Sequence, residues 1–237
     1  MGSRDGENLE YEIIPPRQHH FESFKILIAF SGLRHALSSK PGYNMRVKEC
    51  QDAARILLKL VGRESSEALL SNVTPEEYSK HKGEMEGTLA RRAEHFFTEH
   101  ERVFAGIQEW RKGNIVEFGK LMSRSGQSSI ENYECEVSKS TRQRLGLNVP
   151  YTEDYQCCEP LIHLREILLD APGVYGARFS GAGFRGCCVA FVAPDKAEEA
   201  VAYVDKMYKL AQPELAKEIK ETPIAVICES ANKAYIL

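Results

Sequence analysis

The 237-residue sequence has no apolar run that approaches the roughly 20 residues of a membrane-spanning helix. Its first residues lack the hydrophobic stretch of a secretory signal peptide, and Gly6 stands where the myristoylation pattern requires serine or threonine. An excess of one charge is missing too, because the formal net charge is only −3. We therefore expect neither a nucleic-acid partner nor a membrane partner.

Cysteines spaced for metal binding are also missing. The seven cysteines are an odd number and include the adjacent pairs Cys157-Cys158 and Cys187-Cys188, but no Cys-x-x-Cys occurs. This pattern indicates neither a zinc site nor a disulfide framework. We expect reduced thiols, a cytoplasmic location and no metal ligands in this chain.

What the sequence does contain is a glycine-rich stretch, from Gly173 to Val192. Within it, Gly181-x-Gly183-x-x-Gly186 has the spacing of a dinucleotide-binding fingerprint, which requires a helix directly after the glycines. Cys187 to Val192 is instead small, β-branched and aromatic, which predicts a strand. We therefore reject the Rossmann interpretation and predict a glycine-rich hairpin. Because glycine adopts positive φ and lacks a Cβ, such a turn can bring backbone N–H groups close to an anion.

Hydrophobic periodicity predicts the other elements. Strands are expected, besides those of the hairpin, at 9–13, 24–30, 224–228 and 234–237. Helices are expected over 47–61, 89–110, 161–168 and 200–208, and further ones beginning at 75 and 115. Thr74 and Asn114 are predicted helix caps, and Pro194-Asp195-x-x-Glu198 has the pattern of a capping box.

The second half of the chain has the order helix, strand, strand, helix, strand. This order predicts an antiparallel sheet with helices on one face, which is an α+β fold. The long helix at 89–110 and the helix after Asn114 are expected to pack as an αα-hairpin. Residues 136–157 are basic and polar and lack apolar periodicity, so we expect an atypical insertion that forms a surface loop.

The glycine-rich stretch resembles the third motif of the galactokinase-type sugar kinases of the GHMP superfamily. That motif reads Gly-Ser/Ala-Arg-x-Thr/Ser-Gly-Gly/Ala-Gly-Phe-Gly-Gly-Cys, and Gly176 to Cys187 matches it at nearly every position. Arg185 replaces a glycine, and an arginine there followed by paired cysteines resembles plant galacturonokinases. The resemblance implies a nucleotide-phosphate loop formed by Gly181, Ala182, Gly183, Phe184 and Gly186.

A second segment is similar to the same family. The strand at 24–30 is followed by Gly32-x-Arg34-His, then Tyr43, then a helix with Arg46-x-x-x-Cys50. In the family the equivalent arginine lies beside the catalytic aspartate, and the equivalent tyrosine contacts the sugar. The resemblance thus implies an assisting catalytic role for Arg34 and sugar binding by Tyr43. Without it, Arg34 would be a surface arginine and Tyr43 an aromatic packed at the start of a helix.

The resemblance covers nearly the whole chain apart from 136–157, but only the C-terminal half of the family. It implies that 1–31 are remnant strands of the N-terminal, ATP-binding lobe. Residues 32–237 would be the C-terminal lobe, a ferredoxin-like antiparallel sheet with additional helices. Arg91-Arg92-Ala-Glu-His95 resembles the family's Arg-Arg-Ala-x-His signature, and we expect His95 to be structural.

Three family motifs are missing from the sequence: the Gly-Leu-Ser-Ser-Ser/Ala-Ala phosphate loop, the Met-Asp-Gln segment with the catalytic carboxylate, and the early Arg-Val-Asn-x-Ile-Gly-Glu-His segment. The resemblance implies the C-terminal part of a sugar-1-kinase, monomeric when complete, that phosphorylates D-galacturonate with ATP and Mg²⁺. Without those motifs we expect the chain alone to be inactive, with the Mg²⁺ ligands outside it. Galactose as the sugar, a non-catalytic sugar- or nucleotide-binding module, and a truncated product without an independent role remain alternatives.

Overall fold

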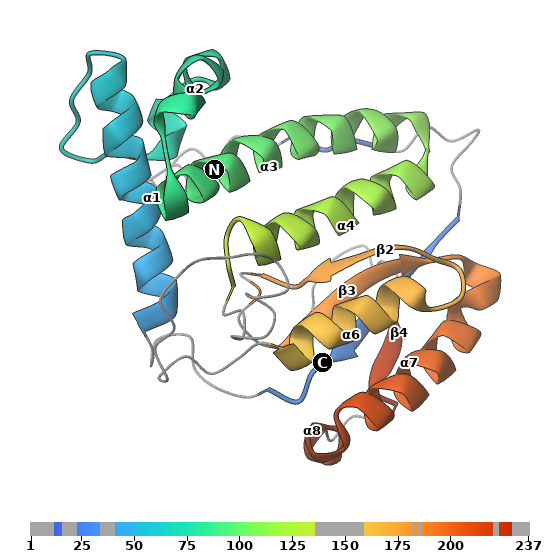
Figure 1. Cartoon of the computed structure of the whole chain (residues 1–237). Coiled ribbons are helices and arrows are strands. Elements are labelled where there is room, and N and C mark those ends of the chain that lie inside the picture. The colour runs from blue at the N-terminus through green and yellow to red at the C-terminus, as the bar shows by residue number, and fades with distance from the viewer. Residues whose placement is uncertain are drawn as a thin grey trace, which may run out of the picture.

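A computed structural model describes residues 12–15, 23–33, 41–135, 159–181, 183, 186–219 and 223–228, with only the backbone at 41–43. Within these ranges one antiparallel sheet has the strand order β2-β3-β1-β4 (Figure 1). The strands are β1 (Lys25–Phe30), β2 (Val174–Phe179), β3 (Cys187–Val192) and β4 (Ala225–Cys228). The predicted strand at 9–13 lies largely outside the described residues, and that at 234–237 entirely outside them.

The described helices confirm those predicted from periodicity and add one short helix near the C-terminus. They are α1 (Pro41–Leu60), α2 (Pro75–His81), α3 (Gly87–Lys112), α4 (Ile115–Glu131), α6 (Glu159–Asp170), α7 (Ala197–Ala211) and the unpredicted α8 (Pro213–Glu218). None of the helices described here is both long and apolar enough to cross a bilayer. The predicted insertion at 136–157 lies outside the described residues.

Two hydrophobic cores hold these elements together. In the first, α6 and α7 cover one face of the sheet, so the predicted α+β class is confirmed (Figure 1). Along β3 every second side chain is buried, as the two-residue period of a strand requires. The second core lies between α1, α2 and α3 and contains Leu57, Leu58, Tyr78, Ala93 and Phe97. The predicted αα-hairpin is also confirmed, since α3 and α4 pack against each other.

Local hydrogen bonds explain where several helices begin and end. Thr74 Oγ1 and Asn114 Oδ1 each accept the N–H three residues later, so both predicted caps are confirmed. Gly113 ends α3 at φ 78°, a conformation that favours glycine.

The predicted capping box before α7 is wrong. Lys196 N–H donates to the Ala193 carbonyl at 3.0 Å, so a 3₁₀ turn, Pro194–Lys196, already precedes the helix. Asp195 therefore lies inside this turn, and the residue at the cap position, Lys196, makes no side-chain capping bond.

Strand β1 occupies a central position in the sheet. Leu27 is paired with Ala190 of β3 on one side and with Ile227 of β4 on the other. A domain boundary at residue 31 would separate β1 from both of its partner strands. Lys25–Phe30 are therefore part of the same sheet as β2, β3 and β4, while the division of the chain at residue 31 stays a prediction.

Helix α4 lies unusually close to β2, the edge strand of the sheet. A Cβ built on Gly176 would lie 1.8 Å from the Gly119 carbonyl oxygen, so only glycine fits at this crossing. One turn further along α4, Ser123 Oγ accepts the backbone N–H of Ala177 at 3.2 Å. Among the described strands β2 pairs only with β3, so the helix supplies a further hydrogen-bond partner to this edge strand.

The Gly176→Ala variant should lower the free energy of unfolding by about 3 kcal/mol, the upper end of the range for overpacking, because the clash is with backbone. Chemical denaturation followed by circular dichroism would measure this loss. Gly83→Ala is the matched control, since a Cβ there meets nothing within 4 Å. Equal midpoints for the two variants would contradict the described crossing.

Candidate functional site

The glycine loop between β2 and β3 has the predicted hairpin geometry. Gly181, Gly183 and Gly186 have φ values of 68°, 76° and 91°, and Ser180 N–H donates to the Cys187 carbonyl at 3.0 Å. A strand follows the glycines, so the rejection of the dinucleotide fingerprint is confirmed. Two further loop residues of the prediction, 182 and 184, lie outside the described residues.

The three described glycines of this loop face different surroundings. A Cβ on Gly181 or Gly186 would meet nothing within 4 Å, so a ligand can approach the backbone closely there. A Cβ on Gly183 would lie 2.8 Å from the Phe179 ring and 3.4 Å from Cys135 Sγ. Gly183 therefore faces the protein interior, whereas Gly181 and Gly186 face open space.

Ser31, which directly follows β1, anchors the far end of the loop. Its N–H and its Oγ both donate to the Gly186 carbonyl oxygen, at 2.9 and 2.6 Å. The Ser31 carbonyl in turn accepts the hydroxyl of Tyr208 at 2.7 Å. Burial raises the pKa of Tyr208, so this hydroxyl stays protonated and donates. Arg34, three residues after Ser31, lies outside the described residues, so its predicted role stays a prediction.

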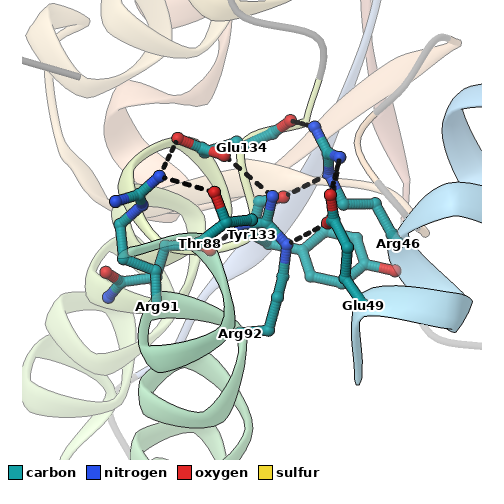
Figure 2. Close-up of polar contacts among 8 residues, drawn as sticks. Arg46, Glu49, Thr88, Arg91, Arg92, Tyr133 and Glu134 are labelled. Carbon is teal, nitrogen blue, oxygen red and sulfur yellow. Dashed lines mark hydrogen bonds and ion pairs between the residues drawn. The ribbon is translucent and has the colours of Figure 1, made fainter. Parts of the chain in front are cut away.

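The other predicted site residue, Tyr43, has its backbone in the first turn of α1, and its side chain is not described. Arg46 follows one turn later, is buried, and makes the polar contacts drawn in Figure 2. Arg46 Nε donates to the Tyr133 carbonyl and Nη2 to the Glu134 carbonyl, both at 2.8 Å. Its Nη1 lies 3.1 Å from the Glu49 carboxylate. The start of α1 is therefore tied to the turn that follows α4.

Two arginines of α3 complete this group of charges. Arg92, with no exposed surface, donates to Glu49 at 2.7 Å, to Glu134 Oε2 at 2.8 Å and to the Asn132 carbonyl. Arg91 donates to the other Glu134 oxygen, Oε1, at 2.9 Å. We call Arg46, Glu49, Arg91, Arg92 and Glu134 the arginine–glutamate cluster. Three guanidinium groups face two carboxylates, so the cluster carries one excess positive charge.

Sequence reasoning missed this cluster, although one signal was present. Arg92 lies three residues after Leu89 and four before Phe96, on the face of α3 that periodicity assigns to the core. An arginine on a buried face needs acidic partners. Their identity could not be read from the sequence, because Glu134 and Arg92 are 42 residues apart.

The described residues form no candidate metal centre. Within the described ranges, no group of three or more histidine, cysteine, aspartate or glutamate side chains could hold a metal ion. We therefore assign no Mg²⁺ ligand to this part of the chain. The five cysteines within the same ranges carry free thiols.

His95 packs beside the turn that the cluster holds. Its Nδ1 lies 3.0 Å from Ser128 Oγ, and its ring centroid lies 5.0 Å from that of Tyr133. Burial lowers the pKa of His95 to about 4; Glu99 opposes this shift, and the charge of Arg102 adds to it. His95 is therefore neutral near pH 7, which fits the predicted structural role.

This lowered pKa makes the stability of the protein depend on pH. Between pH 6.5 and 4 the unfolded chain binds a proton at His95 that the folded chain does not, so stability falls as pH falls through this window. His95→Gln should reduce the slope of unfolding free energy against pH by up to about 1.4 kcal/mol per pH unit. Ser128→Ala, which keeps the buried histidine, should retain the slope. Denaturant titrations from pH 5 to 7 would test this, and an unchanged slope in His95→Gln would contradict it.

Comparisons with known proteins agree with this fold. Residues 105–210 match the family described as GHMP kinases C terminal. The chain is 48% identical to galacturonokinase of Arabidopsis thaliana, in a match that covers 98% of this chain and 50% of the relative. It is 31% identical to galactokinase of Bos taurus, in a match that covers 86% of this chain and 44% of the relative. It thus spans about half the length of the curated relatives it matches.

One solved structure shows the same fold. Lactococcus lactis galactokinase complexed with galactose has a TM-score of 0.66 and 24% identity, covering 93% of this chain and 47% of that one. Residues 105–210 of this chain therefore belong to the GHMP kinase C-terminal family.

Proposed function

We propose that this chain supplies the C-terminal half of a GHMP-type sugar kinase. The complete enzyme would transfer a phosphoryl group from ATP to the anomeric hydroxyl of D-galacturonate. The observation that carries the proposal is the glycine loop, where Gly181 and Gly186 have positive φ and open space in place of a side chain. Galacturonate is favoured over galactose because identity is 48% to the plant galacturonokinase and 31% to bovine galactokinase.

The chemistry assigns a separate role to each part of the site. Phosphoryl transfer depends on positioning and on stabilising charge at the transferred group, to which backbone amides of an open loop can contribute. By the family resemblance, Tyr43 contacts the sugar and Arg34 lies near the reacting hydroxyl. Mg²⁺, when bound, neutralises charge on the phosphates. The carboxylate beside the sugar hydroxyl is not assigned to this chain, so the chain alone is proposed to be inactive.

A fusion protein would test this proposal. The portion of Arabidopsis galacturonokinase outside the match is joined to this full chain, and in parallel to a version that lacks residues 136–157. We expect ATP-dependent phosphorylation of D-galacturonate by at least one fusion and none by the unfused chain.

The outcomes of this test separate the alternatives. Folded fusions that phosphorylate neither galacturonate nor galactose would overturn the proposed function. Activity on galactose alone would correct the substrate. Inactive fusions, together with saturable binding of ATP or galacturonate by the unfused chain, would favour the non-catalytic binding module.

Two substitutions in the active fusion should separate sugar binding from turnover. Tyr43→Phe should weaken sugar use by about 0.5–1.5 kcal/mol, the contribution of one buried hydrogen bond. Arg34→Ala should lower mainly kcat, because its charge matters most as the transition state develops. Steady-state kinetics with varied sugar would show both effects. Unchanged kinetics in Tyr43→Phe, or a rise in KM alone in Arg34→Ala, would remove that residue from its proposed role.

A further inference from the structure

The turn after α4, Asn132 to Cys135, is held both by backbone hydrogen bonds to α4 and by arginine side chains. Its three successive carbonyls, those of residues 132, 133 and 134, accept hydrogen bonds from Arg92, Arg46 and Arg46 again. These arginines come from two different helices, α3 and α1 (Figure 2). The cluster therefore holds the carbonyl groups of the turn, while α4 holds three of its N–H groups.

Glu134 is the residue on which this arrangement depends. Its φ is 51°, the only positive value of a non-glycine residue within the described ranges, and such a conformation persists only where the surroundings enforce it. In this conformation its carbonyl faces Arg46 while its carboxylate lies between Arg91 and Arg92. Without that carboxylate, Arg91 would lose its ion-pair partner, and Arg92, which has no exposed surface, would be paired only with Glu49 among the described residues. A buried unpaired charge is strongly unfavourable.

The turn also contacts the glycine loop. Cys135, the next residue, is fully buried, and its N–H donates to the Ser129 carbonyl at 3.1 Å. Its Sγ lies near Gly183, since a Cβ added to that glycine would be 3.4 Å from the sulfur. A shift of the turn therefore moves the surface on which the glycine loop rests.

The cluster reaches the proposed sugar side as well. Arg46 lies three residues after Tyr43, one turn along α1, and holds two carbonyls of the same turn. One rigid connection thus runs from the start of α1, through Arg46 and Glu134, to Cys135 and Gly183. Hydrogen bonds and ion pairs are stronger in the low-dielectric interior than in water, so the buried bonds of Arg46 and Glu134 keep these elements in a fixed arrangement.

We propose that Glu134 is a positioning residue that sets the glycine loop relative to the sugar-binding start of α1. The effect of Glu134 on catalysis rests on the proposed function. The coupling between the start of α1 and the glycine loop does not, because both belong to this chain. Glu134, whose side chain is fully buried, acts through Arg46 and Cys135.

The first test uses amide hydrogen exchange in the full chain. In Glu134→Gln, the exchange rates of the backbone amides of Gly183 and Arg46 should rise about tenfold relative to those of α7. Both amides lie at the ends of the connection from α1 to the glycine loop, which this substitution loosens. Asn114→Ala is the control: it removes the cap at the opposite end of α4, costs about 1 kcal/mol, and should leave that ratio unchanged.

A second variant keeps the inference testable should Glu134→Gln fail to fold. Cys135→Ala leaves the cluster intact but removes the sulfur beneath Gly183. Exchange should then rise at Gly183 and stay unchanged at Arg46. Unchanged exchange at Gly183 in Cys135→Ala, or in a folded Glu134→Gln, would overturn the coupling.

The second test uses kinetics in the active fusion. Per folded molecule, Glu134→Gln should lower kcat by about 10–100-fold, as expected when reacting groups are displaced by around 1 Å. A merely structural role would lower the folded fraction and leave kcat per folded molecule unchanged. Fusions with no activity before any substitution would overturn the proposed function, while the exchange experiment would still decide the coupling.

Discussion

The pairing of buried arginines with Glu49 and Glu134 is the interaction on which the rest of the described structure depends. The α1–α2–α3 core and the sheet core are separate hydrophobic clusters, and the charges lie where the first core meets the turn that leads to the second. Buried charges are tolerated only with partners in good geometry. Here those partners come from α1, α3 and the turn, so forming the pairs fixes these three elements together.

The glycine loop is held in place at Gly186 and at Gly183. Ser31 fixes the Gly186 end, and Tyr208 fixes Ser31. Gly183 is fixed by packing on Phe179 and Cys135. The open positions, Gly181 and Gly186, thus belong to a loop whose other described contacts are made with the protein interior. Such preorganisation lets backbone groups meet a ligand without being rearranged first.

The sequence predicted features that depend on residues close together in the chain, and it missed those that depend on distant residues. Gly113 ends α3 and Asn114 caps α4, and both act on residues within one helical turn. The end of one helix and the start of the next were therefore predictable. Asp195 was misread because its pattern fits a cap, whereas a 3₁₀ turn starts before it. Glu134 could not be recognised from local sequence, because its role depends on arginines from two distant helices. The roles predicted for Arg34 and Tyr43 come from the resemblance to a family, since no local pattern indicates them.

The central position of β1 also has a consequence for the order of folding. Ser31 and Gly186, which join the end of β1 to the loop, are 155 residues apart. During synthesis β1 leaves the ribosome long before β3 and β4 exist, although it contains the apolar run Ile26 to Phe30. Contacts between such distant residues form late and slow folding. The middle of the sheet is thus completed among the last steps, and the anchor of the glycine loop can form only then.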